Sequence, residues 1–230
     1  MSTIKSKLGF YAAQNFINNN TVIGLGTGST AEYFIKSLAE RYHKEKLDIL
    51  CIPSSENSAR QAQELGLPID LNLNNIDLID ITIDGADEID LENNIMVKGG
   101  GGALLREKIL ASNSKKVVII ADDSKFKKKI GAFGLPIAVS PLSYKQTISK
   151  IELLGFKASL RMNKENSPFL SDDKNHIVDI ELPKSKLDLH NLNRQLKDIP
   201  GVIETGLFIG LGSLAIKGCA DNIEVLKFKI

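Results

Sequence analysis

Short apolar segments alternate with longer amphipathic segments over the first 130 residues. Residues 21–26 (TVIGLG) and 116–121 (KVVIIA) are almost continuously apolar, as expected of strands that are buried on both faces. The residues that follow the first of them, 29–44, have apolar positions at helical spacing. Further strands are predicted at 47–52 and 77–84, and further helices at 55–66 and 102–113. This alternation is typical of parallel strands joined by crossover helices, and it predicts an α/β fold.

The pattern changes after residue 135. The expected order becomes strand 136–140, helix 141–155, strand 157–162, strand 176–182, helix 188–201 and strand 202–208. This β-α-β-β-α-β order is the split βαβ arrangement of a ferredoxin-like domain. The predicted fold class is therefore α/β, with a Rossmann-like parallel-sheet domain and a smaller ferredoxin-like α+β domain.

The two ends of the chain are assigned to the larger domain. Residues 1–20 lack the unbroken apolar segment of a signal peptide and are expected to form an amphipathic first helix. The last residues, 214–230, are apolar enough to pair as strands in the first sheet. We therefore predict residues 1–130 plus 207–230 as the Rossmann-like domain and residues 131–206 as the small domain.

Composition and charge remove several classes of function. The 29 Lys and Arg residues nearly cancel the 28 Asp and Glu residues, so no overall field attracts nucleic acid or an anionic membrane. No segment is apolar over a membrane-spanning length. Cys51 and Cys219 lie far apart and are expected to be core thiols in a reducing cytoplasm rather than a disulfide or metal site.

The loop at residues 24–30 (GLGTGST) leads directly from an apolar strand into a helix. Glycines allow the backbone to approach an anion, and the hydroxyls of Thr27, Ser29 and Thr30 lie at a helix N-terminus whose dipole favours phosphate. Ser29 replaces the third glycine of the dinucleotide fingerprint, and no Walker-type lysine follows, so nucleotide binding is disfavoured. The loop predicts a phosphate site, and the alternative is a tight turn in which a Ser or Thr caps the helix.

Asp84 and Asp87, in the segment DGADEID, follow the strand residues 77–82 (DLIDIT) at the end where open α/β sheets place their ligands. Two nearby carboxylates can divide the work of hydrogen bonding and proton transfer. The alternative is metal binding, but the three histidines, His43, His176 and His190, lie elsewhere, which argues against a transition metal and leaves magnesium open.

Four consecutive glycines in residues 98–108 (KGGGGALLREK) let the chain turn and point peptide N–H groups toward a ligand. If the helix begins near Gly102, Glu107 lies in its second turn, where a carboxylate can face the cleft from a rigid element. The alternative is that Arg106, Glu107 and Lys108 form a solvated face. Together, these loops predict a site that holds a phosphorylated polyol and moves its protons.

The order and spacing of GLGTGST, DGADEID, KGGGGALLREK, ADDSK and IPGVIETGLF resemble ribose-5-phosphate isomerase type A over essentially the whole chain. The resemblance implies interconversion of D-ribose 5-phosphate and D-ribulose 5-phosphate through a cis-enediolate. It implies no cofactor and no metal, and a sugar phosphate as the partner. It also implies a homo-oligomer, expected as a homodimer or homotetramer.

The resemblance also implies roles for individual residues. Glu107 is similar to the general base, and Asp84, Asp87 and Lys98 to the groups that assist ring opening. The other implied substrate contacts are Thr27, Gly28, Ser29, Thr30, Gly85, Ala86, Gly99, Gly100, Gly101 and Lys125. Lys125 has a rival interpretation as a solvated member of the basic run KFKKK. Gly102 and Leu105 stand where many relatives have alanine and threonine.

Two other functions stay open at this point. A sugar-phosphate-sensing regulatory domain would bind the same ligands without turnover, and fold alone does not decide between them. A lactonase or an amino-sugar deaminase would keep the phosphate loop but use a different arrangement of carboxylates and histidines. The simultaneous presence of Asp84, Asp87, Lys98 and Glu107 favours the isomerase.

Overall fold

A six-stranded sheet forms the centre of the larger part of the molecule in the computed structural model, which describes residues 3–72, 74, 76–183, 187–220 and 222–229. Its strands, in the order β13-β12-β6-β3-β1-β2, are Ile223–Lys227, Leu214–Gly218, Val117–Asp122, Ile81–Asp84, Thr21–Leu25 and Ile49–Pro53. All neighbours pair in parallel except β12 and β13, which are antiparallel. The predicted parallel sheet and the return of the C-terminal segment to it are both confirmed.

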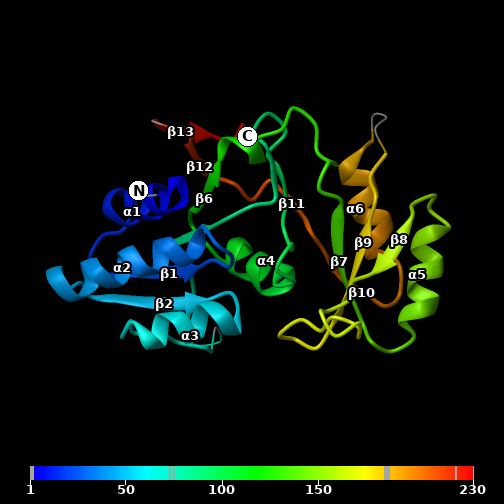
Figure 1. Cartoon of the computed structure of the whole chain (residues 1–230), viewed down its shortest axis with the longest axis horizontal. Coiled ribbons are helices and arrows are strands. Elements are labelled where there is room, and N and C mark those ends of the chain that lie inside the picture. The colour runs from blue at the N-terminus through cyan, green and yellow to red at the C-terminus, as the bar shows by residue number, and fades with distance from the viewer. Residues whose placement is uncertain (1–2, 73, 75, 184–186, 221, 230) are drawn as a thin grey trace.

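Helices cover the two faces of this sheet unequally (Figure 1). α1 (Ile4–Phe16), α2 (Ala31–Glu45) and α3 (Glu56–Glu64) share a core on one face, whereas α4 (Leu104–Ser112) packs on the other. Val118 and Ile120 of β6 face the first core, and the alternate residue Ile119 faces the opposite side. Burial on both faces explains why this strand is continuously apolar in the sequence.

The predicted first helix is confirmed. Thr3 caps α1 by accepting a hydrogen bond from the Ser6 N–H, as helix-starting threonines do. Leu8, Ala12 and Ala13 form its buried face, which lies in the same core as α2. None of the helices in the described residues combines the length and apolarity that a membrane crossing needs.

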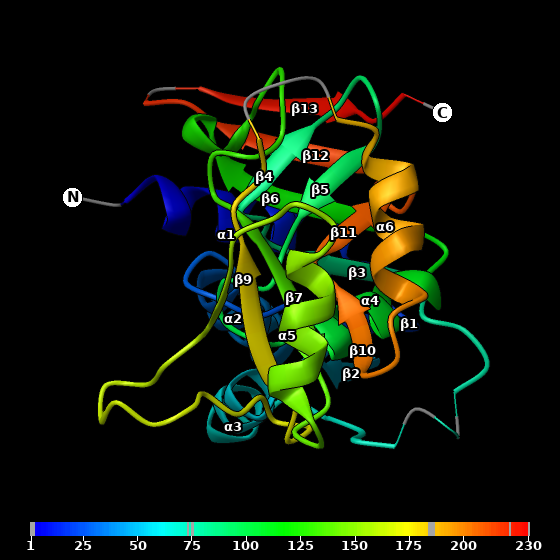
Figure 2. The ribbon, with the colours of Figure 1, turned by 90° about the vertical axis from the view of Figure 1, so that its right-hand side faces the viewer.

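A four-stranded antiparallel sheet forms the second unit. Its elements in chain order are β7 (Leu135–Val139), α5 (Tyr144–Glu152), β8 (Ala158–Leu160), β9 (His176–Ile180), α6 (Leu189–Lys197) and β10 (Val202–Thr205). The spatial order β10-β7-β9-β8 is that of a ferredoxin-like sheet, which confirms the predicted fold class. α5 and α6 cover its outer face (Figure 2), and the inner face packs on Leu104 of α4 through Ala138 and Ile177.

A third, three-stranded sheet joins the two units and was not predicted. It consists of β4 (Glu88–Asp90), β5 (Ile95–Val97) and β11 (Leu207–Ile209), paired antiparallel in the order β11-β5-β4. The single strand expected at residues 202–208 is wrong, because the chain leaves the four-stranded sheet after Thr205 and enters this one at Leu207.

Gly206 is the residue at which the chain changes sheets. Its N–H donates to Pro136 O of β7 at 2.7 Å, and its carbonyl accepts from Lys98 N at 2.9 Å. A side chain at this position would begin 2.4 Å from Lys98 O. Only glycine allows the backbones of the two sheets to approach so closely.

The domain boundaries at residues 130, 131, 206 and 207 stay a prediction. Leu207 of β11, with Ile95 and Val97 of β5, packs into the core of the four-stranded unit. The three-stranded sheet therefore shares side chains with that unit, although β4, through Ile89, packs beneath the parallel sheet.

The two cysteines differ in burial. Cys51 is fully buried in the core under α2, as expected, and burial raises the pKa of its thiol to about 12. Cys219 is only partly buried, so the prediction of a second core thiol is wrong. It follows the last residue of β12, where the chain turns toward the edge strand β13.

Candidate functional site

The site lies where the strand order of the parallel sheet reverses. β1 lies between β2 and β3, and ligands of such sheets bind beyond the carboxyl ends of the strands at this point. The loops after β1 and β3 meet there, since Thr27 N donates to Asp84 Oδ1 at 3.0 Å. A side chain on Gly26 would begin 2.2 Å from the same oxygen, so glycine is required for the two loops to touch.

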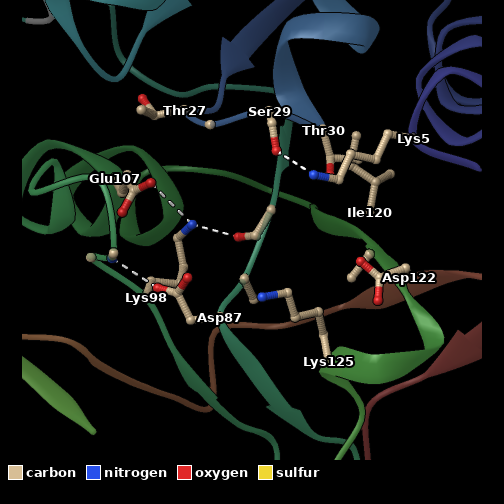
Figure 3. A pocket seen from close by; sticks show the side chains of 17 residues that line it. Lys5, Thr27, Ser29, Thr30, Asp87, Lys98, Glu107, Ile120, Asp122 and Lys125 are labelled. Atoms are coloured by element: carbon tan, nitrogen blue, oxygen red, sulfur yellow. Dashed lines mark hydrogen bonds and ion pairs between the residues drawn. The ribbon is translucent and has the colours of Figure 1, made fainter. Parts of the chain in front are cut away.

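A small cavity of about 150 Å³ opens between these loops and the start of α4 (Figure 3). Every predicted site residue except Asp84 lines it: Thr27, Gly28, Ser29, Thr30, Gly85, Ala86, Asp87, Lys98, Gly99, Gly100, Gly101, Glu107 and Lys125. Four further residues line it without having been predicted: Lys5, Ile120, Ala121 and Asp122. The structure thus brings together residues from across the first 125 positions.

The loop after β1 has the form of an anion site. Gly28 has a φ of +101°, which favours glycine, and its α-carbon faces open space. Thr30 precedes α2 but makes no capping bond to it, so the alternative of a Thr-capped turn is not supported. The Thr27 hydroxyl forms a hydrogen bond with Ser54 Oγ at 2.8 Å. The hydroxyls of Ser29 and Thr30 and the N-terminus of α2 remain as candidate groups for an anion.

Lys5 is a site residue that the sequence did not reveal. From the first turn of α1, its Nζ donates to Ser29 Oγ at 2.7 Å, so a positive charge lies directly beside the loop (Figure 3). Nothing in the local pattern separates Lys5 from the other lysines of the amphipathic helix. Asp122 could have been found, because it is the last residue of β6 and faces the same end of the sheet.

Three charged side chains form a buried cluster beneath the cavity. Lys98 Nζ lies 2.9 Å from Asp84 Oδ2, 3.2 Å from Glu107 Oε1 and 2.5 Å from Gly85 O. Lys98 is 3% exposed, Asp84 2% and Glu107 5%. An ammonium group has three N–H donors, and here each has an acceptor. The cluster fixes the lysine ammonium in position at the wall of the cavity.

Burial gives these groups unusual proton affinities. Desolvation, opposed by the Lys98 ammonium and reinforced by the negative charges of Asp84 and Asp87, raises the pKa of Glu107 to about 8. Burial lowers the pKa of Lys98, but the two carboxylates outweigh it and raise that pKa above its usual value. Glu107 Oε2 is buried and has no hydrogen-bond partner in the described part of the chain. One carboxylate oxygen at the cavity is therefore available to receive a proton.

Glu107 lies closer to the helix start than predicted. α4 begins at Leu104, so Glu107 occupies the first turn and not the second. The alternative of a solvated face at residues 106–108 is wrong, because Glu107 is buried and Lys108 donates to Glu204 at 2.9 Å and to Thr205 O at 2.6 Å. The side chain that faces the cavity is held on a rigid element.

The glycine segment before α4 turns sharply. Gly99 and Gly102 have φ values of +104° and +82°, which favour glycine. Gly100 N donates to Asp87 Oδ2 at 2.8 Å (Figure 3), which joins this segment to the loop after β3. Of the two positions that the resemblance suggested as departures from the family, Gly102 packs against the Phe169 ring and Leu105 lies outside the cavity lining.

No cluster of His, Cys, Asp or Glu side chains in the described residues has the arrangement of a metal site. His43 contacts Leu65 O at 2.8 Å and His176 contacts Phe169 O at 3.2 Å. Both are structural contacts away from the cavity. The cavity groups themselves are suited to a phosphate and a proton transfer, since they combine backbone N–H groups, hydroxyls, ammonium groups and carboxylates.

Comparison with known proteins identifies the family. Residues 50–222 match the family model of ribose 5-phosphate isomerase A (phosphoriboisomerase A). The chain is 49% identical to ribose-5-phosphate isomerase A of Bacillus cereus, over 97% of this chain and 99% of the relative.

Solved structures agree with this match. Ribose 5-phosphate isomerase from Plasmodium falciparum has a TM-score of 0.93 at 34% identity, over 100% of both chains. A D-ribose-5-phosphate isomerase in complex with phospho-erythronic acid has a TM-score of 0.90 at 34% identity, over 97% of both chains. These relatives are similar to the chain in sequence and in fold over nearly their whole length. The chain belongs to the ribose-5-phosphate isomerase A family.

Proposed function

We propose that this chain interconverts D-ribose 5-phosphate and D-ribulose 5-phosphate, with Glu107 as the base that moves the proton. The observation that supports this most strongly is the buried Glu107 carboxylate, whose Oε2 has no partner among the described residues and whose pKa is raised to about 8. A carboxylate with a pKa near the working pH can both accept and return a proton. Family membership supports the same reaction.

The substrate phosphate binds at the loop after β1. Gly28 exposes its backbone, Ser29 and Thr30 offer hydroxyls, and α2 points its N-terminus at the cavity. Lys5 on one side and Lys125 on the other line the same cavity and supply positive charge (Figure 3). An anion with two negative charges is held here without a metal, because backbone dipoles and two ammonium groups balance it.

Ring opening is assigned to Asp87. This carboxylate lines the cavity, and the Gly100 N–H fixes its Oδ2 at 2.8 Å. Asp84 lies behind the cavity lining, where it accepts from Thr27 N and Gly85 N and contacts Lys98. We assign Asp84 to holding Lys98 and the two loops in place, so that the sugar hydroxyl meets Asp87.

Proton transfer then follows on the open-chain sugar. Glu107 takes the proton from C2, and the C1 aldehyde oxygen gains negative charge as the cis-enediolate forms. Glu107 returns the proton to C1, and the proton on the C2 hydroxyl passes to the C1 oxygen, which leaves a C2 ketone. Charge that develops on oxygen is stabilised by the buried Lys98 ammonium, an effect that is large away from water.

Lys98 can reach the substrate by exchanging one contact. Its bond to Glu107 is the longest of the three, at 3.2 Å. A substrate oxygen that replaces Glu107 Oε1 would take up that N–H and release the carboxylate for the proton. The phospho-erythronic acid bound to a relative supports this mechanism, because its planar carboxylate resembles an enediolate in shape and charge.

Isomerisation in deuterated water tests the proposal. Deuterium should appear, at least in part, at the carbon that receives the proton, because a carboxylate exchanges its proton with solvent during the transfer. NMR of the sugar phosphates, together with a coupled assay for ribulose 5-phosphate, measures label and turnover. Turnover without any label would indicate a direct hydride shift and contradict Glu107 as the base, and absence of turnover would refute the isomerase function.

We also propose that the chain acts in the cytoplasm as a homodimer or homotetramer. Support for a reducing compartment comes from Cys51 and Cys219, which are both free thiols. The expectation of an oligomer comes from the resemblance to the family. Light scattering of the purified protein at working concentration measures the assembly directly.

A further inference from the structure

The connection between β8 and β9 extends from the four-stranded sheet to the active-site loop. Figure 1 shows this yellow segment reaching toward α3 and α4. It is fastened there, since Asp172 accepts from Glu56 N at 2.7 Å and Asp173 accepts from Arg106 Nε at 2.8 Å. Phe169 of the same segment packs against Gly102. The second unit therefore touches the glycine segment that precedes Glu107.

Arg161, the residue after β8, makes the contact closest to the chemistry. Its Nη1 donates to Gly99 O at 2.9 Å and to Gly100 O at 3.0 Å. Both glycines line the cavity, and both contacts go to main-chain carbonyls. One guanidinium nitrogen thus holds two successive peptide groups of the active-site loop.

The guanidinium itself is held firmly. Asp179 of β9 accepts from its Nε at 2.8 Å and from its Nη2 at 2.5 Å, which is the bidentate geometry of a strong pair. The Arg161 backbone is fixed by Ile177 O at 2.8 Å and by the Phe169 N–H at 2.9 Å. The side chain is 17% exposed, and its planar fork loses little freedom on binding. This arginine is preorganised before any ligand arrives.

The geometry of a trans peptide shows what this contact controls. The C=O and N–H groups of one peptide point in opposite directions. The Gly99 carbonyl points to Arg161, and the N–H on the other edge of that peptide, Gly100 N–H, reaches Asp87 at 2.8 Å. The next peptide repeats the arrangement, with the Gly100 carbonyl on Arg161. Its N–H, on Gly101, therefore points away from Arg161, and in the described part of the chain it has no hydrogen-bond acceptor.

We propose that Arg161 is a positioning residue that holds the peptide planes of Gly99–Gly100 and Gly100–Gly101, so that Asp87 is anchored and the Gly101 N–H is presented to a substrate oxygen. The inference rests on the proposed isomerase function and adds a residue from the second unit to it. Arg161 touches no substrate and acts through the two glycines. Glycines rotate freely without such a restraint, and small misplacements in a site reduce rates strongly.

Removing the guanidinium tests this role. Arg161→Gln should lower kcat about 10- to 100-fold, with KM changed by less than about threefold, because the phosphate loop after β1 is untouched. Arg161→Lys should not recover the rate, since a lysine cannot span two carbonyls and Asp179 together. Lys157→Gln is the matched control, because it breaks an exposed ion pair between the residue before β8 and Glu181, the residue after β9. Its kcat should equal that of the wild type.

Chemical rescue separates positioning from loss of structure. Millimolar methylguanidinium added to Arg161→Ala should restore part of kcat, whereas it should not change the rate of the wild type or of Lys157→Gln. Asp179→Asn, which leaves the arginine in place but removes its anchor, should lower kcat less than Arg161→Gln does. This variant keeps the test informative if the substitutions at position 161 prevent folding.

The outcomes distinguish the two proposals. No turnover by the wild type and by Lys157→Gln would refute the isomerase function itself. Turnover by both, together with an unchanged kcat in folded Arg161→Gln or in Asp179→Asn, would refute only the role of Arg161. A loss of kcat that follows the fraction of unfolded protein, with no rescue by methylguanidinium, would also refute it.

Discussion

Two buried glutamates near the cavity have opposite environments. Glu88, at the start of β4, is 1% exposed and accepts from the N–H groups of Gly131, Ala132 and Phe133 at 2.6, 2.9 and 3.0 Å. Glu107, at the start of α4, has Lys98 on one oxygen and no partner among the described residues on the other. Both are buried carboxylates, and the number of donors around each differs. Full satisfaction of a carboxylate indicates a structural role, and incomplete satisfaction indicates chemistry.

Of the substitutions that test this comparison, the one at Glu107 should have the largest effect on turnover. Glu107→Gln keeps the shape of the side chain but removes the oxygen that accepts the proton, so kcat should fall about 100- to 10,000-fold. KM and the thermal midpoint should stay near those of the wild type. The coupled assay and a melting curve measure both. Near-normal kcat in a folded variant would move the base to Asp87.

The same substitution at Glu88 should act on stability. Glu88→Gln places an amide NH₂ against backbone N–H groups, and at least one buried donor loses its acceptor, at a cost of about 1–3 kcal/mol in the free energy of unfolding. kcat of the folded protein should change less than about tenfold, far below the range for a general base. Urea unfolding measures the cost. A large loss of kcat at unchanged stability would contradict the proposal that Glu88 is the structural glutamate and Glu107 the catalytic one.

The raised pKa of Glu107 predicts how activity and stability depend on pH. Because the ionised form accepts the proton, kcat/KM should rise with pH up to the pKa of about 8 and then level off. The folded protein holds this proton more tightly than the unfolded chain does. The contribution of Glu107 to stability is therefore present at pH values below its ordinary pKa and is lost as pH rises through about 8. A pH-rate profile and unfolding curves at several pH values measure both trends, and Glu107→Gln should abolish both contributions.

A substitution in the loop after β1 should have a smaller effect, which acts on substrate binding. Thr30→Val removes one hydroxyl donor at nearly constant volume, and a hydrogen bond to a charged group contributes about 1.5–3 kcal/mol. KM should therefore rise about tenfold or more, with kcat little changed. Inhibition by phosphorylated and unphosphorylated analogues measures whether the phosphate is the group affected. An unchanged KM with unchanged inhibitor affinity would remove Thr30 from the phosphate site.

Chelation should have the smallest effect. The described residues contain no cluster suited to a metal, and the proposed chemistry uses carboxylates and ammonium groups. Turnover should therefore survive dialysis against EDTA. Loss of activity that a divalent ion restores would show that Asp84 and Asp87 are metal ligands.

The parts of the fold that the sequence revealed are those with long, uniform patterns. Residues 117–121 are apolar on both faces because two cores meet at β6. Such a segment is typical of a central strand. β4 and β5 have three residues each, which is too short for a period to show. The break at Gly206 depends on two carbonyl and N–H contacts from distant segments, and no local signal marks it.

The residues of the site also fall into those that the sequence revealed and those that it did not. The motifs at residues 27–30 and 84–87 were found because loops at the carboxyl ends of parallel strands meet in space, and the motif at residues 98–101 was found by its run of glycines. Lys5 and Arg161 were missed because each reaches the site from another layer, α1 in one case and the second unit in the other. Their contacts are set by packing between elements, which a linear pattern does not contain.

Gly206 has a mechanical consequence. The residue that links the two sheets bonds Pro136 on one side and Lys98 on the other. Lys98, which Asp84 and Glu107 hold in the site, is therefore tied through one residue to β7 of the four-stranded sheet. In a protein redesigned by exchanging the second unit for another, this contact would have to be kept for Lys98 to stay in place.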